Sequence, residues 1–224
     1  GYGHSQIVEP YDLEHVHPWL WFLMSNVRDI EKALDSRRGF FFKSIGEGHA
    51  LVPWGGEGRV RRKIDATNPI ELSEALAECR SMVAEEAARL KANVPGFEDA
   101  YISLVADQLG VTESRRLQGR HIIARDDLDK PFEDVIAVTG HWTKYGCVYN
   151  IPYRSLLPRS IDNLLVAGRC ISADHRAHHA TKEIPSCMAT GQAAGTAAAM
   201  AARSGVAVKD VDVPNLQAKL REAG

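Results

Sequence analysis

The chain has 224 residues, of which 45% are hydrophobic and 25% are charged. Its 27 basic and 29 acidic side chains give a formal net charge of −2. These values exclude a disordered tail, a collagen-like repeat and a coiled-coil rod, and the charge balance gives no reason to expect a nucleic-acid partner.

The cysteine spacing and the hydropathy pattern indicate in which cellular compartment to expect the protein. Cys79, Cys147, Cys170 and Cys187 are widely spaced and form no C-x-x-C pair, so neither a disulfide framework nor a zinc site is indicated. The apolar run from Pro18 to Met24 is far too short to cross a bilayer, and no signal peptide is recognisable. We therefore expect a cytoplasmic protein with no membrane association.

The first half of the chain predicts short strands followed by one long helix. Glycines and aromatic residues up to about residue 58 are typical of strands separated by turns. Apolar side chains then recur at helical spacing from Pro69 to about Asn93, with Asn68 as the N-cap and Pro95-Gly96 after the end. A second, short helix is expected over residues 100–109, ended by Gly110.

The second half predicts two strands and two helices. Val135–Val138 is a short strand candidate, and Leu164–Gly168 has the pattern of a parallel strand buried on both faces. Residues 145–153 are aromatic and rich in turn formers. An Ala-rich helix is expected over Thr190–Arg203, and an amphipathic helix over Asp212–Ala223.

The stretch from Asn163 to Met200 carries the strongest functional signal. It predicts a strand ending in Gly168-Arg169, an irregular His-rich loop, and a helix that opens at Thr190-Gly191-Gln192. Glycine at a strand end lets a ligand approach the backbone, and a helix N-terminus offers unpaired N–H groups to oxygen atoms. The same pattern also suits a small-residue helix packed on a sheet without any ligand, and spacing does not decide between the two.

Three ordered segments resemble the C-terminal part of FAD-dependent oxidoreductases, which have a glutathione-reductase-like flavin fold. They are Ile-Pro-Tyr-Arg-Ser-Leu-Leu-Pro at 151–158, Asn-Leu-Leu-Val-Ala-Gly-Arg-Cys-Ile-Ser-Ala at 163–173, and Pro-Ser-Cys-Met-Ala-Thr-Gly-Gln-Ala-Ala-Gly at 185–195. Residues 94–101 and 109–116 also resemble the substrate-side region of that group, so the resemblance covers about residues 60–224. It implies that FAD is the cofactor, that Gly168 and Arg169 contact it, and that Gly191, Gln192 and Ala193 direct backbone N–H groups toward flavin N1 and O2.

The sequence departs from this family in one respect. The family begins with a G-x-G-x-x-G turn that holds the FAD pyrophosphate, and no such pattern occurs in the 224 residues. We expect the missing half to lie upstream. It could have been cleaved off or lie outside this sequence, but we favour a second polypeptide that shares the FAD with this chain. The implied fold is α/β: the C-terminal part of a two-domain, Rossmann-like FAD-binding fold with a mixed β-sheet substrate region and a long helix. Residues 1–150 would form the substrate-side region and residues 151–224 the end of the FAD-binding domain.

Candidate reactive residues lie around this stretch. His175 or His178 is the expected catalytic base, although a histidine there can equally serve to bind the backbone. Arg115, Tyr145 and Tyr153 are candidate substrate-binding residues, against the alternatives of a surface ion pair and of core tyrosines. We expect no metal, since the His-x-x-His-His pattern lacks a carboxylate ligand. The basic cluster Arg59, Arg61, Arg62 and Lys63 suggests a solvated face or a partner contact.

The function implied by the resemblance is that of a dehydrogenase subunit that transfers hydride from a small polar organic substrate to flavin N5. Two alternatives stay open. The chain could be a non-catalytic scaffold or regulatory subunit with a vestigial flavin motif. Less favoured is a metal-dependent hydrolase that uses the histidines.

Overall fold

The computed structural model describes residues 18–55, 64–141 and 144–224. The chain divides into two compact units, and the division falls between Ser114 and Arg115. The basic cluster Arg59–Lys63 lies outside the described residues. No helix in the described ranges is both long and apolar enough to span a membrane.

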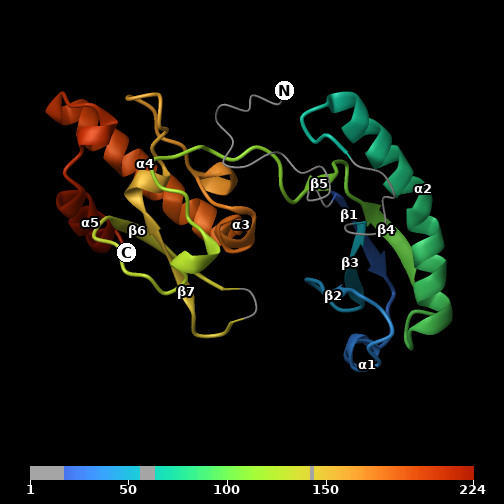
Figure 1. The fold of residues 1–224 in the computed structure, drawn as a ribbon. Helices are drawn as coiled ribbons and strands as arrows, with labels where there is room; N and C mark the ends of the chain where they lie inside the picture. The colour runs from blue at the N-terminus through green and yellow to red at the C-terminus, as the bar shows by residue number, and fades with distance from the viewer. Residues whose placement is uncertain (1–17, 56–63, 142–143) are drawn as a thin grey trace. The chain divides into compact units, whose positions relative to one another are not determined.

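The first unit is an antiparallel sheet with a long helix against it (Figure 1). Its elements are β1 (Pro18–Ser25), α1 (Ile30–Asp35), β2 (Phe42–Lys43), β3 (His49–Gly55), α2 (Pro69–Asn93), β4 (Tyr101–Val105) and β5 (Gly110–Val111). The strand order is β2-β3-β1-β4, and β5 pairs with β1.

Helix α2 confirms the prediction for residues 69–93. The Asn68 side chain accepts a hydrogen bond from the Ile70 N–H at 3.0 Å, and Pro69 occupies the first turn. The buried positions Ala75, Cys79, Val83, Ala87 and Leu90 recur at helical spacing and belong to the core of this unit.

The predicted helix over residues 100–109 is wrong. Tyr101–Val105 forms strand β4, which pairs antiparallel with β1, and Gly110 begins β5. Tyr, Ile and Val favour an extended backbone, and the ladder with β1 supplies the hydrogen bonds that a short helix would have made internally.

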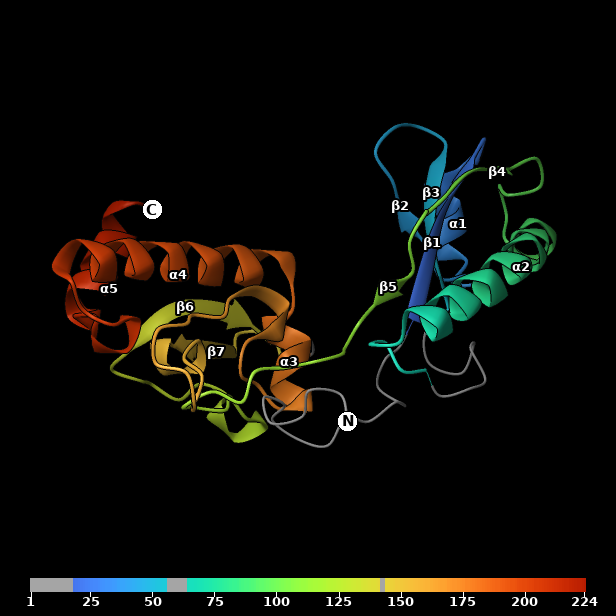
Figure 2. The ribbon, with the colours of Figure 1, turned by 90° about the horizontal axis from the view of Figure 1, so that it is seen from above.

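The second unit, residues 115–224, packs three α-helices against a two-stranded sheet. Its elements are the 3-10 turn η3 (Arg125–Asp127), β6 (Val135–Gly140), β7 (Val148–Pro152), η4 (Tyr153–Ser155), η5 (Gly168–Cys170), α3 (His175–Thr181), α4 (Ile184–Ser204), η6 (Val208–Asp210) and α5 (Val213–Glu222). Helix α4 lies along the β6–β7 pair, with α5 beside it (Figures 1 and 2). The strand predicted at Val135–Val138 and the terminal helix are confirmed.

The parallel strand predicted at Leu164–Gly168 is wrong. Residues 164–167 form no strand, and all named strand pairs among the described residues are antiparallel. Leu164 is exposed, and the Val166 N–H donates to the carbonyl oxygen of Leu156 at 2.9 Å. An apolar run becomes a buried parallel strand only where neighbouring strands supply a ladder, and none of the described residues does so here.

The overall class is α/β, as predicted, but the units do not follow the expected division at 150/151. Strand β7 (Val148–Pro152) crosses that position and pairs with β6 inside one compact unit. The roles assigned to residues 1–150 and 151–224 stay predictions.

Candidate functional site

The 3-10 turn η5 is held by two buried side chains. Gly168 has a φ of +83°, a conformation that favours glycine, and its N–H donates to Thr190 Oγ1 at 3.1 Å. The next residue, Arg169, accepts a hydrogen bond at its carbonyl oxygen from His178 Nε2 at 3.0 Å. The turn is thus fixed from α4 and from α3, while the side chains of Arg169 and Cys170 are exposed.

His178 does not have the geometry of a base. Its side chain is 1% exposed, and its Nε2 must carry the proton because its partner is a carbonyl oxygen. Burial and, next, the charge of Arg116 lower the pKa of His178 to about 3. A buried imidazole that stays neutral above that pH is a poor proton acceptor, so His178 acts here as a residue that positions the turn.

The segment predicted as an irregular His-rich loop is the helix α3. Asp174 caps it, and its Oδ1 accepts the Ala177 N–H at 2.7 Å. His175, the first residue of α3, is half-buried and lies edge-on to His179 with ring centroids 5.0 Å apart. His175 is therefore the more accessible of the two predicted bases.

Helix α4 begins at Ile184, not at Thr190 as predicted. Gly191, Gln192 and Ala193 therefore lie about two turns inside the helix, where backbone N–H groups bond to carbonyls four residues earlier. The expectation that these three N–H groups face a ligand is wrong for this reason. Ala193 is also fully buried in the core of the unit.

One face of α4 is exposed and apolar. We call it the α4 outer face, and it comprises Ile184, Met188, Gly191, Gly195 and Ala198. The Ile184 and Met188 residues are 74% and 71% exposed. A Cβ added at Gly191 or Gly195 would meet no atom of the described residues within 4 Å. Packing among the described residues therefore gives no reason for glycine at either position.

The predicted substrate-binding residues are not brought together. Tyr145 is 94% exposed and Arg115 is exposed at the start of the unit. Tyr153 is buried, and its hydroxyl donates to the carbonyl oxygen of Val208 at 2.7 Å. Burial raises its pKa to about 12. Tyr153 is a core tyrosine, and the substrate-binding prediction for it is wrong.

The described residues indicate neither a reactive thiol nor a metal site here. Cys170 and Cys187 are free thiols, and burial raises the pKa of Cys187. Within the ranges that the structure describes, no three His, Cys, Asp or Glu side chains are grouped so that they could hold a metal ion.

Sequence reasoning missed the Thr190 hydroxyl, which bonds both Gly168 and the carbonyl oxygen of Ser186. Its only signal was a hydroxyl residue at the position where the helix was predicted to begin. The reasoning also missed a basic cavity beside α3, lined in part by Arg176 and His179. These two residues lie three positions apart, which brings them to one side of a helix, but the segment was predicted to be a loop.

Comparison with protein-family models matches residues 29–220 to the family described as FAD dependent oxidoreductase. Comparisons with curated proteins and with solved structures found no match. The family match spans most of the chain and includes the turn η5, helix α3 and the α4 outer face. The chain therefore belongs to the FAD-dependent oxidoreductase family, and its cofactor is FAD.

Proposed function

We propose that this chain is a subunit of a dehydrogenase that removes hydride from a C–H bond of a small polar organic substrate. FAD is shared with a second polypeptide that carries the G-x-G-x-x-G half. When bound, FAD accepts the hydride at N5 and carries negative charge near N1 and O2 after reduction.

The observation that supports this proposal is the open surface over the turn η5 and the α4 outer face. A Cβ would find open space at Gly168, Gly191 and Gly195, and Gly168 is tied to α4 through Thr190. Each exposed helix glycine costs about 1 kcal/mol relative to alanine, so a surface that keeps two of them is suited to the close approach of a flat ring. These glycines fit the isoalloxazine because they leave an open surface on which the ring can lie. The two glycines in α4 do not fit it as N–H donors.

Gly168, Arg169 and Gly191 of this surface would hold the ring, together with Gln192, the exposed residue next to Gly191. The guanidinium of Arg169 lies close enough to Cys187 to lower the pKa of that thiol, against the larger effect of burial. An exposed positive charge at this point would stabilise negative charge on a ligand lying over the turn. His175, on the helix that fixes the same turn, is the proposed base that takes the substrate proton.

The second polypeptide would cover the remainder of the α4 outer face. Ile184 and Met188 are large apolar residues left exposed on a regular helix, which is typical of surfaces covered in an assembly. The four free cysteines agree with a reducing compartment, and we propose a cytoplasmic location.

The test uses the native assembly purified with whatever chain accompanies it. We expect flavin absorption and anaerobic bleaching of that absorption by the substrate. Gly191→Leu should abolish FAD binding while the assembly still forms. The matched control is Ala202→Leu, on the same side of α4 but about 16 Å further along the axis.

The scaffold alternative predicts the opposite outcome. A Gly191→Leu assembly with the FAD content and bleaching rate of the wild type would support a scaffold and contradict the proposal. Loss of FAD in both leucine variants would also count against a ring lying specifically beside Gly168 and Gly191.

A further inference from the structure

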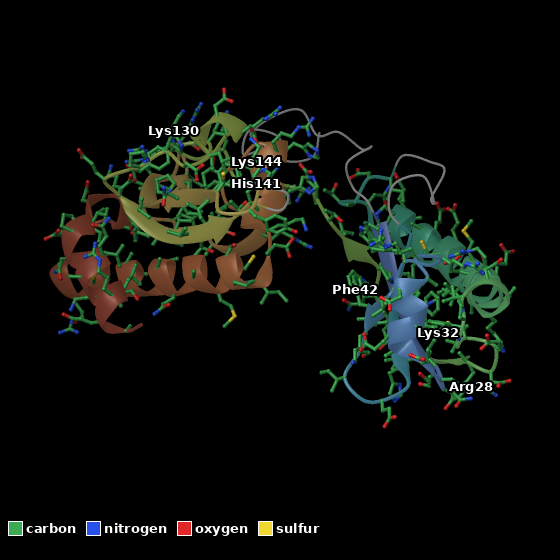
Figure 3. All side chains as sticks on the ribbon, turned by 90° about the horizontal axis from the view of Figure 1, so that it is seen from below. Arg28, Lys32, Phe42, Lys130, His141 and Lys144 are labelled. Carbon is green, nitrogen blue, oxygen red and sulfur yellow. The ribbon has the colours of Figure 1, made fainter. Side chains whose placement is uncertain are left out.

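The second unit contains a cavity whose lining includes none of the residues proposed to hold FAD. Its volume is about 360 Å³, within the range of pockets for small molecules. It opens between η3, the β6–β7 turn, strand β7 and helix α3. The residues that line it include Arg125, His141, Lys144, Tyr149, Arg176 and His179. Figure 3 labels His141 and Lys144 on the β6–β7 turn.

The cavity is lined by positive charge alone. Arg125, Lys144 and Arg176 are exposed cations, and no described carboxylate forms an ion pair with any of them or lines the cavity. Three like charges around one cavity repel one another, and this repulsion is relieved when an anion binds between them.

Two carboxylates near the cavity form hydrogen bonds with backbone and side-chain groups. Asp174 accepts the backbone N–H groups of Arg125 and Ala177, at 3.0 and 2.7 Å. Asp127 accepts hydrogen bonds from His121 and Lys130, at 2.9 and 3.0 Å. Both acids keep their negative charge in these contacts, but neither lines the cavity, where the charged side chains are basic.

Tyr149 contributes a buried donor. The residue is 1% exposed, and its hydroxyl has no hydrogen-bond partner among the described residues. Burial, and next the charge of Asp174, raise its pKa, so the hydroxyl keeps its proton at neutral pH. A buried hydroxyl without a partner is costly, and an oxygen atom entering this cavity would satisfy it.

His141 packs against Tyr149 in the lining of the cavity. Its ring stacks on Tyr149 with centroids 5.9 Å apart, and its Nδ1 accepts the Lys144 N–H at 3.1 Å. The cavity thus combines exposed cations with a buried hydroxyl, and both kinds of group bind oxyanions.

We propose that this cavity is a binding site for a small organic oxyanion, a carboxylate or a phosphate. Arg125, Lys144 and Arg176 supply the charge, and the Tyr149 hydroxyl donates a hydrogen bond to an oxygen of the ligand. The site stands on the residues of the cavity alone and does not depend on the placement of FAD.

The test is isothermal titration calorimetry on the native assembly at fixed ionic strength. The probes are succinate, which represents carboxylates, and inorganic phosphate, with sodium chloride as the reference salt. We expect saturable binding of at least one probe, and the probe that binds identifies the class of ligand. Saturable binding of neither probe overturns the proposal.

Variants locate the binding. Arg125→Gln combined with Arg176→Gln should weaken binding about tenfold or more, because two charge-assisted contacts are lost. Tyr149→Phe should weaken it severalfold. Arg203→Gln, which removes an exposed charge at the end of α4, is the matched control and should bind like the wild type.

If the double variant does not fold, Lys144→Gln on the exposed β6–β7 turn serves instead and should weaken binding to a similar degree. Wild-type affinity in the folded charge variants overturns the proposal. The FAD content of each sample is measured in parallel, so a failure of the flavin assignment can be distinguished from a failure of the oxyanion site.

Discussion

His178 Nε2 lies 3.0 Å from the carbonyl oxygen of Arg169, which joins helix α3 to the turn beside the proposed flavin surface. The imidazole is buried and neutral, and its Nδ1 has no hydrogen-bond partner among the described residues. One histidine of the histidine-rich segment therefore has a structural role. It fixes the backbone of the turn from one side while Thr190 fixes it from the other.

The first prediction concerns the pH dependence of stability. The folded pKa of His178 is about 3, whereas its unperturbed value is 6.5. The unfolded chain therefore binds more protons below pH 6.5, and the stability from this group is complete above that pH and falls as the pH drops toward 3. Between pH 7 and pH 5 the free energy of unfolding should fall by about 2 kcal/mol through His178.

The control is His178→Gln, which keeps an N–H donor for the Arg169 carbonyl but does not titrate. Urea unfolding of the wild type and the variant at pH 7 and pH 5 isolates the contribution of this side chain. An equal loss of stability in both proteins would show that His178 is not buried in its neutral form.

The second prediction concerns the Thr190 hydroxyl. Thr190→Val should lower the free energy of unfolding by about 1–3 kcal/mol, because it leaves the Gly168 N–H without its acceptor. It should also reduce the FAD content of the native assembly. Thr190→Ser retains the hydroxyl and should restore most of the FAD content. If the two variants lose FAD equally, the loss comes from packing and not from the hydrogen bond.

The third prediction sets stability against cofactor binding. Gly191→Ala should raise the free energy of unfolding of the FAD-free protein by about 0.5–1 kcal/mol, since alanine favours the helix and its Cβ meets no described atom. The same methyl group stands where the ring is proposed to lie, so the FAD dissociation constant should rise. Fluorescence titration with FAD measures this effect. Tighter or unchanged binding would contradict the role given to Gly191.

The fourth prediction separates the two tyrosines once expected to bind substrate. Tyr153→Phe should lower the free energy of unfolding by about 1–3 kcal/mol, because the Val208 carbonyl loses its donor. It should leave FAD content unchanged. Tyr145→Phe, at a 94% exposed position, should change neither quantity. Thermal unfolding followed by circular dichroism, with FAD content measured on the same samples, checks both variants.

Signals within a few residues of one another were sufficient to predict where helices α2 and α5 lie. The cap at Asn68, the proline at position 69 and the helical spacing that follows predicted α2 with its observed ends. Asp212 likewise accepts the Asn215 N–H and begins α5. Caps and spacing act within a few residues, so they can be read without knowledge of the fold.

Features that depend on distant partners could not be predicted in this way. Tyr101–Val105 is a strand because β1 pairs with it, about 80 residues earlier in the chain. Residues 164–167 lack such a partner and form no strand. The oxyanion cavity also escaped prediction, because it needs α3 and the β6–β7 turn to meet. The N–H groups of Gly191, Gln192 and Ala193 were assigned wrongly because α4 begins earlier than expected.

The central claim is tested most directly by an experimental structure of the native assembly that locates the flavin. The account predicts density for the isoalloxazine against Gly168 and Arg169 of the turn η5 and against Gly191 of α4, with the adenine end held by the second polypeptide. An assembly without flavin density at this surface, or with the ring bound elsewhere, would contradict it.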